Sequence, residues 1–368
     1  MLLSQTLQHQ QVPPLMEFFL QIPLLIRNFI IYSLEMANII VVFPNKRIVE
    51  TVLCFSIFLF CYLPTAFCSG FLQKLYLPVP GPESYAFDSA GRGPYASLAD
   101  GRVFRYLGPA VGFRCIHFFK SRKPRRFCDG TNRTDISQIC GRPTGLGFYY
   151  KTGELFLGDA DLGLVVIPSG GGPGIQLASS AEGVRFGFPD GLEVDQATGI
   201  VYFTDASSRY NLSQINNIVS NRDATGRLLK YDPRTKNVTV LLRGLSGAAG
   251  VAISEDGSYL LVTQFVIGQV SKYWLKGPLA NTAEVLVNMT GMPDKIKRNT
   301  KGEYWIAVTV TSKNSTQLQG QRIDGDGNSL ETLTFSPDFD SSLITEVQEY
   351  KGALYLASLY VGYVGVYR

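Results

Sequence analysis

Short stretches of alternating apolar and polar residues run through the chain from about residue 80 to its end, separated by turns rich in Gly, Asp and Asn. This pattern predicts half-buried β-strands joined by tight turns. Long helical periodicity is absent beyond the N-terminal region. The stretch RYNLSQINNIVSNR, residues 209–222, predicts one short helix in a loop between strands.

The strands form a weak repeat: Pro or a small residue, a variable residue, an alternating strand, a Gly-containing turn and a second apolar strand. The variable residue occupies six positions, 45 to 61 residues apart: Glu83, Thr144, Asp190, Ala249, Asp294 and Thr345. Propeller blades repeat every ~40–50 residues. We therefore predict an all-β, six-bladed β-propeller, because a sandwich would not require a common register in six units.

If the first strand of each blade is innermost, the variable residues line a central channel, with Lys295 beside them. Glu83, Asp190 and Asp294 would then converge on the axis and repel one another unless a cation neutralised them. Ca²⁺ prefers oxygen ligands and would do so; Lys295 could do part of the work without metal. In the alternative interpretation, the acids cap strand starts and face water.

The N-terminal region has the layout of a leader. Lys46 and Arg47 precede an apolar run over residues 52–63, and small residues follow near Cys68. The run is too short to span a bilayer, which needs ~20 apolar residues, and predicts a signal peptide. We divide the chain into residues 1–35, a gene-model extension or extra apolar segment; 36–68, the signal peptide; and 69–368, the propeller.

Two features downstream of the leader agree with entry into the secretory pathway. Five asparagines lie in N-x-Ser/Thr sequons: Asn132, Asn211, Asn237, Asn288 and Asn314. They predict a glycosylated surface. Cys128 and Cys140 flank a short polar loop, and an oxidising compartment would let them pair. Cys115 is left over and is expected to be buried.

Several classes of partner are not predicted. The net charge of +4 is small for 368 residues, and no basic stripe interleaves with aromatics, so we expect no nucleic-acid partner. The basic run at residues 120–126 is interpreted as a solvated loop. His117 is the single histidine after the leader and is expected at the surface, so zinc is not predicted. We expect a monomer with a small-molecule ligand in the channel.

Five segments of the sequence are specific enough to indicate a family. Residues 199–210, 224–245, 271–278, 283–308 and 345–367 resemble the strictosidine synthase family. The segment from Cys128 to Cys140 resembles that family's single disulfide-closed loop. The resemblance covers nearly all of the chain after the leader, and it implies a six-bladed propeller in a vacuolar or secreted plant protein.

The family's founding activity is a Pictet–Spengler condensation of tryptamine with secologanin, which uses a channel glutamate in the sixth blade as acid and base. The resemblance implies that Thr345 stands at that position, and a hydroxyl cannot replace a carboxylate in proton transfer near neutral pH. Glu346 is adjacent, but side chains alternate along a strand, so it should face away from the channel. A one-residue bulge would turn it inward.

The six marker residues also resemble a broader group, the calcium-dependent lactonases and arylesterases of the paraoxonase type. Glu83, Asp190 and Asp294 match that group's calcium ligands, whereas Ala249 and Lys295 depart from them. The group's histidine dyad has no counterpart here.

Three hypotheses for function follow. The first is a strictosidine synthase-like protein without synthase activity, acting as a hydrolase of small esters or lactones with a channel cation. The second is a Pictet–Spenglerase that uses a displaced Glu346. The third is a non-enzymatic glycoprotein that binds a small molecule or a partner in its channel.

Overall fold

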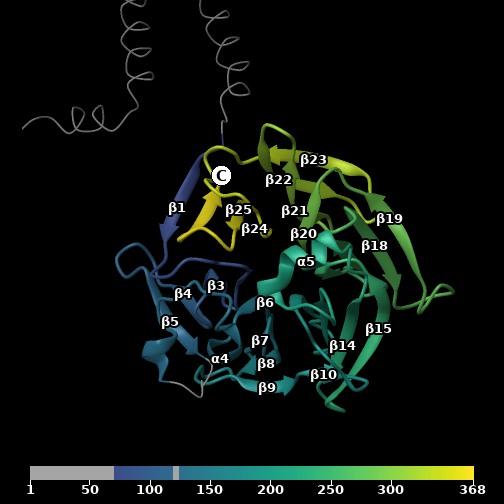
Figure 1. The fold of residues 1–368 in the computed structure, drawn as a ribbon, viewed down its shortest axis with the longest axis horizontal. Coiled ribbons are helices and arrows are strands. Elements are labelled where there is room, and N and C mark those ends of the chain that lie inside the picture. The colour runs from purple at the N-terminus through teal and green to yellow at the C-terminus, as the bar shows by residue number, and fades with distance from the viewer. Residues whose placement is uncertain (1–69, 119–123) are drawn as a thin grey trace, which may run out of the picture. The chain divides into compact units, whose positions relative to one another are not determined.

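Six antiparallel sheets of four strands surround a common centre in a computed structural model that describes residues 70–118 and 124–368 (Figure 1). The six-bladed, all-β propeller predicted from the repeat is confirmed. The predicted segments 1–35 and 36–68, and part of the basic run at 120–126, lie outside the described residues. Among the helices that the structure describes, none combines the length and apolar character needed to cross a membrane.

The strands of blades 1 to 5 follow one another in chain order. Blades 1 and 2 contain β2 (Tyr85–Ala86), β3 (Tyr95–Ser97), β4 (Arg102–Tyr106) and β5 (Phe113–Phe118), then β6 (Pro143–Tyr149), β7 (Glu154–Asp159), β8 (Gly163–Ile167) and β9 (Ile175–Ala178). Blades 3 and 4 contain β12 (Pro189–Val194), β13 (Val201–Asp205), β14 (Gly226–Asp232) and β15 (Asn237–Leu245), then β16 (Ala248–Ile253), β17 (Tyr259–Gln264), β18 (Gln269–Trp274) and β19 (Ala283–Asn288).

Blade 5 contains β20 (Met292–Arg298), β21 (Tyr304–Thr311), β22 (Thr316–Ile323) and β23 (Ser329–Thr334). Blade 6 contains β24 (Glu346–Tyr350), β25 (Ala353–Ala357), β26 (Tyr363–Tyr367) and β1 (Leu72–Tyr76), so the two ends of the described chain share one sheet. Because Leu72 pairs with Tyr367 in antiparallel register, hydrogen bonds close the ring.

Apolar side chains of neighbouring blades pack between the sheets. Leu192 and Phe203 of blade 3, for example, are buried in one cluster with Phe156 of blade 2. Strands with one alternating face toward each neighbouring blade account for the period-2 pattern in the sequence. The core is therefore a ring of inter-blade layers around the channel.

Four inner strands share a register shift near their first residues. It falls between Pro143 and Gly145 in β6, Pro189 and Leu192 in β12, Ala248 and Val251 in β16, and Pro293 and Ile296 in β20. A bulge of this kind redirects a side chain without breaking the sheet. A Cβ on Gly191 would lie 2.3 Å from the Ala249 carbonyl oxygen, so close approach of the next blade requires glycine there.

The short helix predicted over residues 209–222 is present as the 3₁₀ turn η3 (Leu212–Gln214) followed by α5 (Ile215–Ser220). Figure 1 shows α5 near the centre of the ring. The remaining short elements are η2 (Arg125–Phe127), α4 (Ser137–Cys140) and a two-stranded sheet formed by β10 (Ser180–Ala181) and β11 (Val184–Arg185).

The predictions for the cysteines and the histidine in and beside blade 1 were only partly correct. The Cys128–Cys140 disulfide is confirmed. The predictions for the other two residues were wrong: Cys115 is exposed, whereas His117 is buried with Nδ1 2.5 Å from the Gly172 carbonyl oxygen. The reason is a register shift where the outer strand β5 pairs with β4, which the sequence pattern does not reveal.

Removal of the disulfide should destabilise the propeller. The bridge closes a loop with a sequence separation of 12, and a loop of this size is worth ~2–4 kcal/mol through the entropy of the unfolded chain. We expect Cys128→Ser/Cys140→Ser to lower the melting temperature by several degrees in thermal melts. Cys115→Ser is the control and should melt like the parent; a double variant that also does so would contradict the prediction.

Candidate functional site

A cavity of about 230 Å³ opens beside α5, at one end of the channel. Its walls are mostly apolar, and its floor is acidic. The lining consists of Glu83, Phe188, Asp190, Ile215, Asn216, Val219, Phe265, Met292, Asp294, Ser342, Leu343, Leu359 and Tyr360. A small pocket with apolar walls and a few convergent polar groups is typical of a ligand site.

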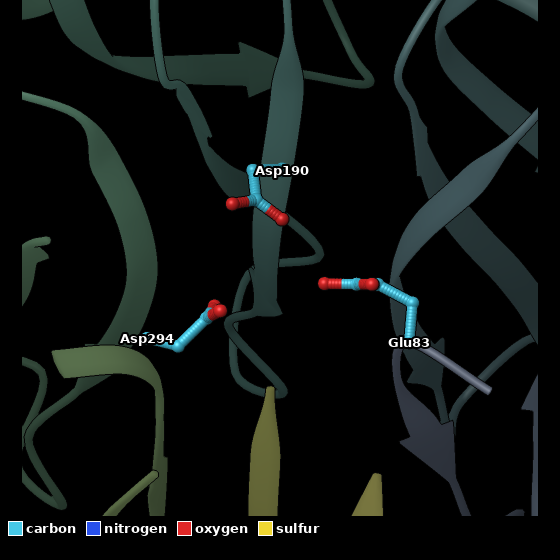
Figure 2. A group of neighbouring side chains, drawn as sticks. All are labelled: Glu83, Asp190 and Asp294. Carbon is cyan, nitrogen blue, oxygen red and sulfur yellow. The ribbon is translucent and has the colours of Figure 1, made fainter. Parts of the chain in front are cut away.

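The acidic floor is built by three blades that are distant in sequence. Glu83, Asp190 and Asp294 come from blades 1, 3 and 5, and Figure 2 shows their carboxylates pointing toward one another. One oxygen of each lies within 4.8 Å of the others. Glu83 and Asp190 are each only 3% exposed. The sequence repeat thus identified three side chains that the ring brings together.

Lys295 extends into the middle of this cluster. Its Nζ donates to Glu83 Oε1 at 2.7 Å and to Asp190 Oδ1 at 2.8 Å, and it lies 3.6 Å from Asp294 Oδ1. The register shift in β20 spans residues 294 and 295, so two consecutive side chains reach the same cluster. Lys295 is 1% exposed and is not among the residues that line the cavity.

The four charged groups of the cluster shift one another's pKa values. Burial, reinforced by Glu83, raises the pKa of Asp190 to about 6, even though Lys295 acts in the opposite direction. Burial and the neighbouring carboxylates also raise the pKa of Asp294 well above its usual range. Burial alone would lower the pKa of Lys295, but the surrounding acids outweigh it and raise that pKa. The ammonium therefore stays charged.

Two carboxylate oxygens of the floor remain without a hydrogen-bond partner. Glu83 Oε2 and Asp294 Oδ1 are both buried and unpaired among the residues that the structure describes. An unpaired buried acceptor costs free energy, so a hydrogen-bond donor that reached either oxygen would be stabilised there. The Asp294 side chain is the most accessible of the three acids, at 17% exposure.

Thr144, Ala249 and Thr345 are fully buried and are not among the residues that line the cavity. Thr144 Oγ1 donates to the Pro189 carbonyl oxygen at 2.9 Å, and Thr345 Oγ1 donates to the Glu83 carbonyl oxygen at 3.1 Å. Each bond links one blade to the next. Both hydroxyl groups therefore help to hold neighbouring blades together.

Two further members of this set were missed by the sequence analysis. Thr204 Oγ1 donates to the Ala249 carbonyl oxygen at 2.5 Å, and Thr263 Oγ1 donates to the Asp294 carbonyl oxygen at 2.6 Å. Both lie near the end of the second strand of their blades. The recurrence of threonine in FTD and VTQ was the available signal.

Glu346 lies between blades 6 and 1. Its Oε2 accepts from Ser84 Oγ at 2.7 Å, and its Oε1 accepts from the Tyr85 backbone N–H at 2.9 Å. Lys297 Nζ is 3.6 Å from Oε2. The side chain is fully buried and is not part of the cavity lining.

Comparisons with known proteins match this architecture. The strictosidine synthase family model matches residues 190–278. Strictosidine synthase-like protein 12 of Arabidopsis thaliana is 40% identical over 317 residues, which cover 84% of this chain and 94% of that protein. Strictosidine synthase of Catharanthus roseus is 36% identical over 303 residues, covering 80% and 86%. The chain belongs to the strictosidine synthase family.

More distant solved structures share the fold of this family member. A gluconolactonase from Xanthomonas campestris has a TM-score of 0.57 at 16% identity, covering 82% of this chain and 90% of its own. Regucalcin from Agrobacterium tumefaciens, described as a calcium-binding protein, has a TM-score of 0.57 at 13% identity, covering 80% and 92%. At these identities the likeness concerns the fold alone.

Calcium does not fit the cluster as this family member builds it. The three carboxylates are suitable donors, but Ca²⁺ takes 6–8 oxygen ligands at 2.3–2.6 Å. Here an ammonium group occupies hydrogen-bond positions on two of the acids, and Ala249 supplies no side-chain ligand. A calcium ion at the position of the Lys295 ammonium group would be repelled by that charge.

Stability should depend on pH through Asp190. Its pKa is about 6 in the folded chain, above the ordinary 3.8, so the folded state binds the proton more tightly and loses stability as pH rises through this window. Relative to the parent, Asp190→Asn should therefore gain on the order of 1 kcal/mol between pH 5 and pH 7. Urea unfolding at several pH values measures this difference.

Asp256→Asn is the matched control for that experiment. Hydrogen bonds from Ser258 and Ser254 hold the pKa of Asp256 at about 2, so this carboxylate is ionised throughout the range. Its stability difference from the parent should not change with pH. A difference for Asp190→Asn that is equally constant would contradict the raised pKa.

Proposed function

We propose that this family member is a secretory or vacuolar glycoprotein that lacks synthase activity and binds a small, largely apolar molecule bearing an amine or hydroxyl group. The observation that carries the proposal is the pair of unpartnered oxygens, Glu83 Oε2 and Asp294 Oδ1, at the floor of an apolar cavity. A donor group on the ligand would satisfy them, while its apolar body would contact residues such as Phe188 and Phe265.

The loss of synthase activity follows from the residues around blade 6. Thr345 stands where the family resemblance implies a catalytic glutamate, and its hydroxyl group is bonded to a neighbouring blade. The carboxylate of Glu346 is held by Ser84 and Tyr85 outside the cavity. Neither residue can offer a carboxylate to an imine or an indole in the cavity, as the condensation requires.

An organic ammonium ion is the best match for the floor. Three carboxylates face one ammonium group, so an ionised cluster carries excess negative charge. A protonated amine would supply both the donors and the missing positive charge. Hydrogen bonds between charged groups are roughly twice as strong as neutral ones, which favours an amine over an alcohol.

Hydrolysis of a small ester or lactone is the second candidate, favoured by the pKa of about 6 for Asp190. A carboxylate with this pKa is a suitable general base near neutral pH. It would take a proton from water as the water oxygen bonds to the carbonyl carbon, and the proton would then pass to the leaving alkoxide as the C–O bond breaks. The gluconolactonase names among the structural neighbours fit this class of substrate.

The surface is consistent with a glycosylated, secreted monomer. Asn132, Asn237, Asn288 and Asn314 are exposed, while Asn211 is half-buried. The confirmed disulfide suits an oxidising compartment. We therefore retain the vacuole or the extracellular space as the proposed location.

Purified protein incubated with tryptamine and secologanin should yield no strictosidine, because no carboxylate is available at the position of Thr345. Chromatography with mass detection measures the product, and an active family synthase serves as the positive control. Product that disappears in Glu346→Gln would instead establish the displaced-glutamate hypothesis.

Binding of a primary aryl-alkyl amine such as tryptamine should depend on Asp294. A bound cation would favour the ionised form of Asp294. Asp294→Asn keeps the shape but cannot ionise, and we expect roughly a tenfold loss of affinity, or ~1.4 kcal/mol, by calorimetry. Glu255→Gln makes the same change in net charge at an exposed position and should bind like the parent. Equal affinity for all three proteins would contradict an amine site at the floor.

The parent and the variant Asp190→Asn, tested with a panel of small esters and lactones, separate binding from hydrolysis. Turnover by the parent that Asp190→Asn abolishes would support the hydrolase. Heat of binding without turnover would support a ligand-binding role alone.

A further inference from the structure

The acids at the centre of this propeller are held together by the ammonium group of Lys295. We infer that Lys295 is a built-in cation that replaces a divalent metal ion at the centre of the propeller, and that removing its side chain would create a divalent-cation site. This inference does not depend on which ligand enters the cavity.

The positions of the charged atoms support this replacement. The carboxylate oxygens of Glu83, Asp190 and Asp294 lie within 4.8 Å of one another, as oxygens that share one ion do. Lys295 Nζ is 2.7 and 2.8 Å from two of them and 3.6 Å from the third. The ammonium group and a divalent ion would therefore compete for the same space.

Comparison of the repeats shows that blade 5 differs from blades 2, 3 and 4 at the position of the lysine. Blades 2, 3 and 4 carry Gly145, Gly191 and Gly250 directly after the variable residue, whereas blade 5 carries Lys295 there. A Cβ on any of those three glycines would lie 2.3 to 2.4 Å from the backbone of the next blade. In blade 5 the Lys295 side chain is accommodated, and its length lets it reach blades 1 and 3.

The unpaired oxygens also support the inference that the lysine replaces a divalent ion. Glu83 Oε2 and Asp294 Oδ1 have no hydrogen-bond partner among the described residues, although Lys295 is beside both acids. One ammonium group has three protons and cannot satisfy three carboxylates fully. Such a cluster has spare oxygen donors, which a larger cation would use once the lysine was gone.

Two substitutions separate charge from space. Lys295→Ala removes the ammonium group and opens the site, whereas Lys295→Met removes the charge but leaves an apolar chain of similar length in the way. Both should melt lower than the parent at neutral pH, by roughly 10 °C, because three buried acids lose their counter-charge. Calcium should restore several degrees to Lys295→Ala and little to Lys295→Met.

The parent protein provides a test that does not depend on the folding of a variant. Its melting temperature should be the same in EDTA and in millimolar calcium, and calorimetry should detect no calcium binding at the cluster. Lys295→Ala should bind one calcium ion with measurable heat, and Asp190→Asn in the same background should abolish that heat.

Several outcomes would overturn the inference. EDTA that destabilises the parent, or calcium heat in the parent that Asp190→Asn removes, would show that metal and lysine coexist. If Lys295→Ala is folded but neither binds calcium nor is stabilised by it, removal of the lysine does not create a divalent-cation site. If Lys295→Ala folds only when calcium is present, the inference is supported; if calcium does not improve its recovery, the inference fails.

Discussion

Four charged side chains meet at the centre of the propeller, and the ion pairs of Lys295 with Glu83 and Asp190 connect blade 5 to blades 1 and 3 across the channel. Bringing three carboxylates into a buried space is expensive without a compensating cation. The lysine makes this arrangement feasible, and the carboxylates in turn keep the lysine charged. The floor of the cavity and the unpaired oxygens both follow from this arrangement.

A second constraint is the close approach of neighbouring blades around the channel. Threonine hydroxyl groups on several blades donate to carbonyl oxygens of the next blade, and glycines permit the backbones to meet. Thr345 is part of this set, bonded to the backbone of Glu83. The residue that the family resemblance implies at the catalytic position therefore links two blades here. A shared fold hosts different sites in this way.

The apolar walls and the acidic floor of the cavity have separate origins. The wall residues on α5, Ile215 and Val219, come from an insertion between strands of blade 3, whereas the floor comes from the inner ends of three blades. Changes in the insertion can alter the shape of the cavity, and so the ligand that fits it, without disturbing the ion pairs at its floor. Relatives with the same ring could differ in ligand through this segment alone.

The sequence by itself determined the fold, because period-2 strands recurring at blade-length intervals have few alternatives to a ring. It also identified Glu83, Asp190 and Asp294 as residues at equivalent positions of the repeat, and the cysteines that pair. It offered Lys295 as one possible counter-charge beside a metal ion, but it could not decide between them, because two consecutive residues share one side of a strand only at a bulge. Nor could it show that the hydroxyls of Thr144 and Thr345 bond to neighbouring blades, or that a register shift exposes Cys115 and buries His117. These outcomes depend on how closely backbones distant in sequence approach one another, and only the tertiary structure decides that.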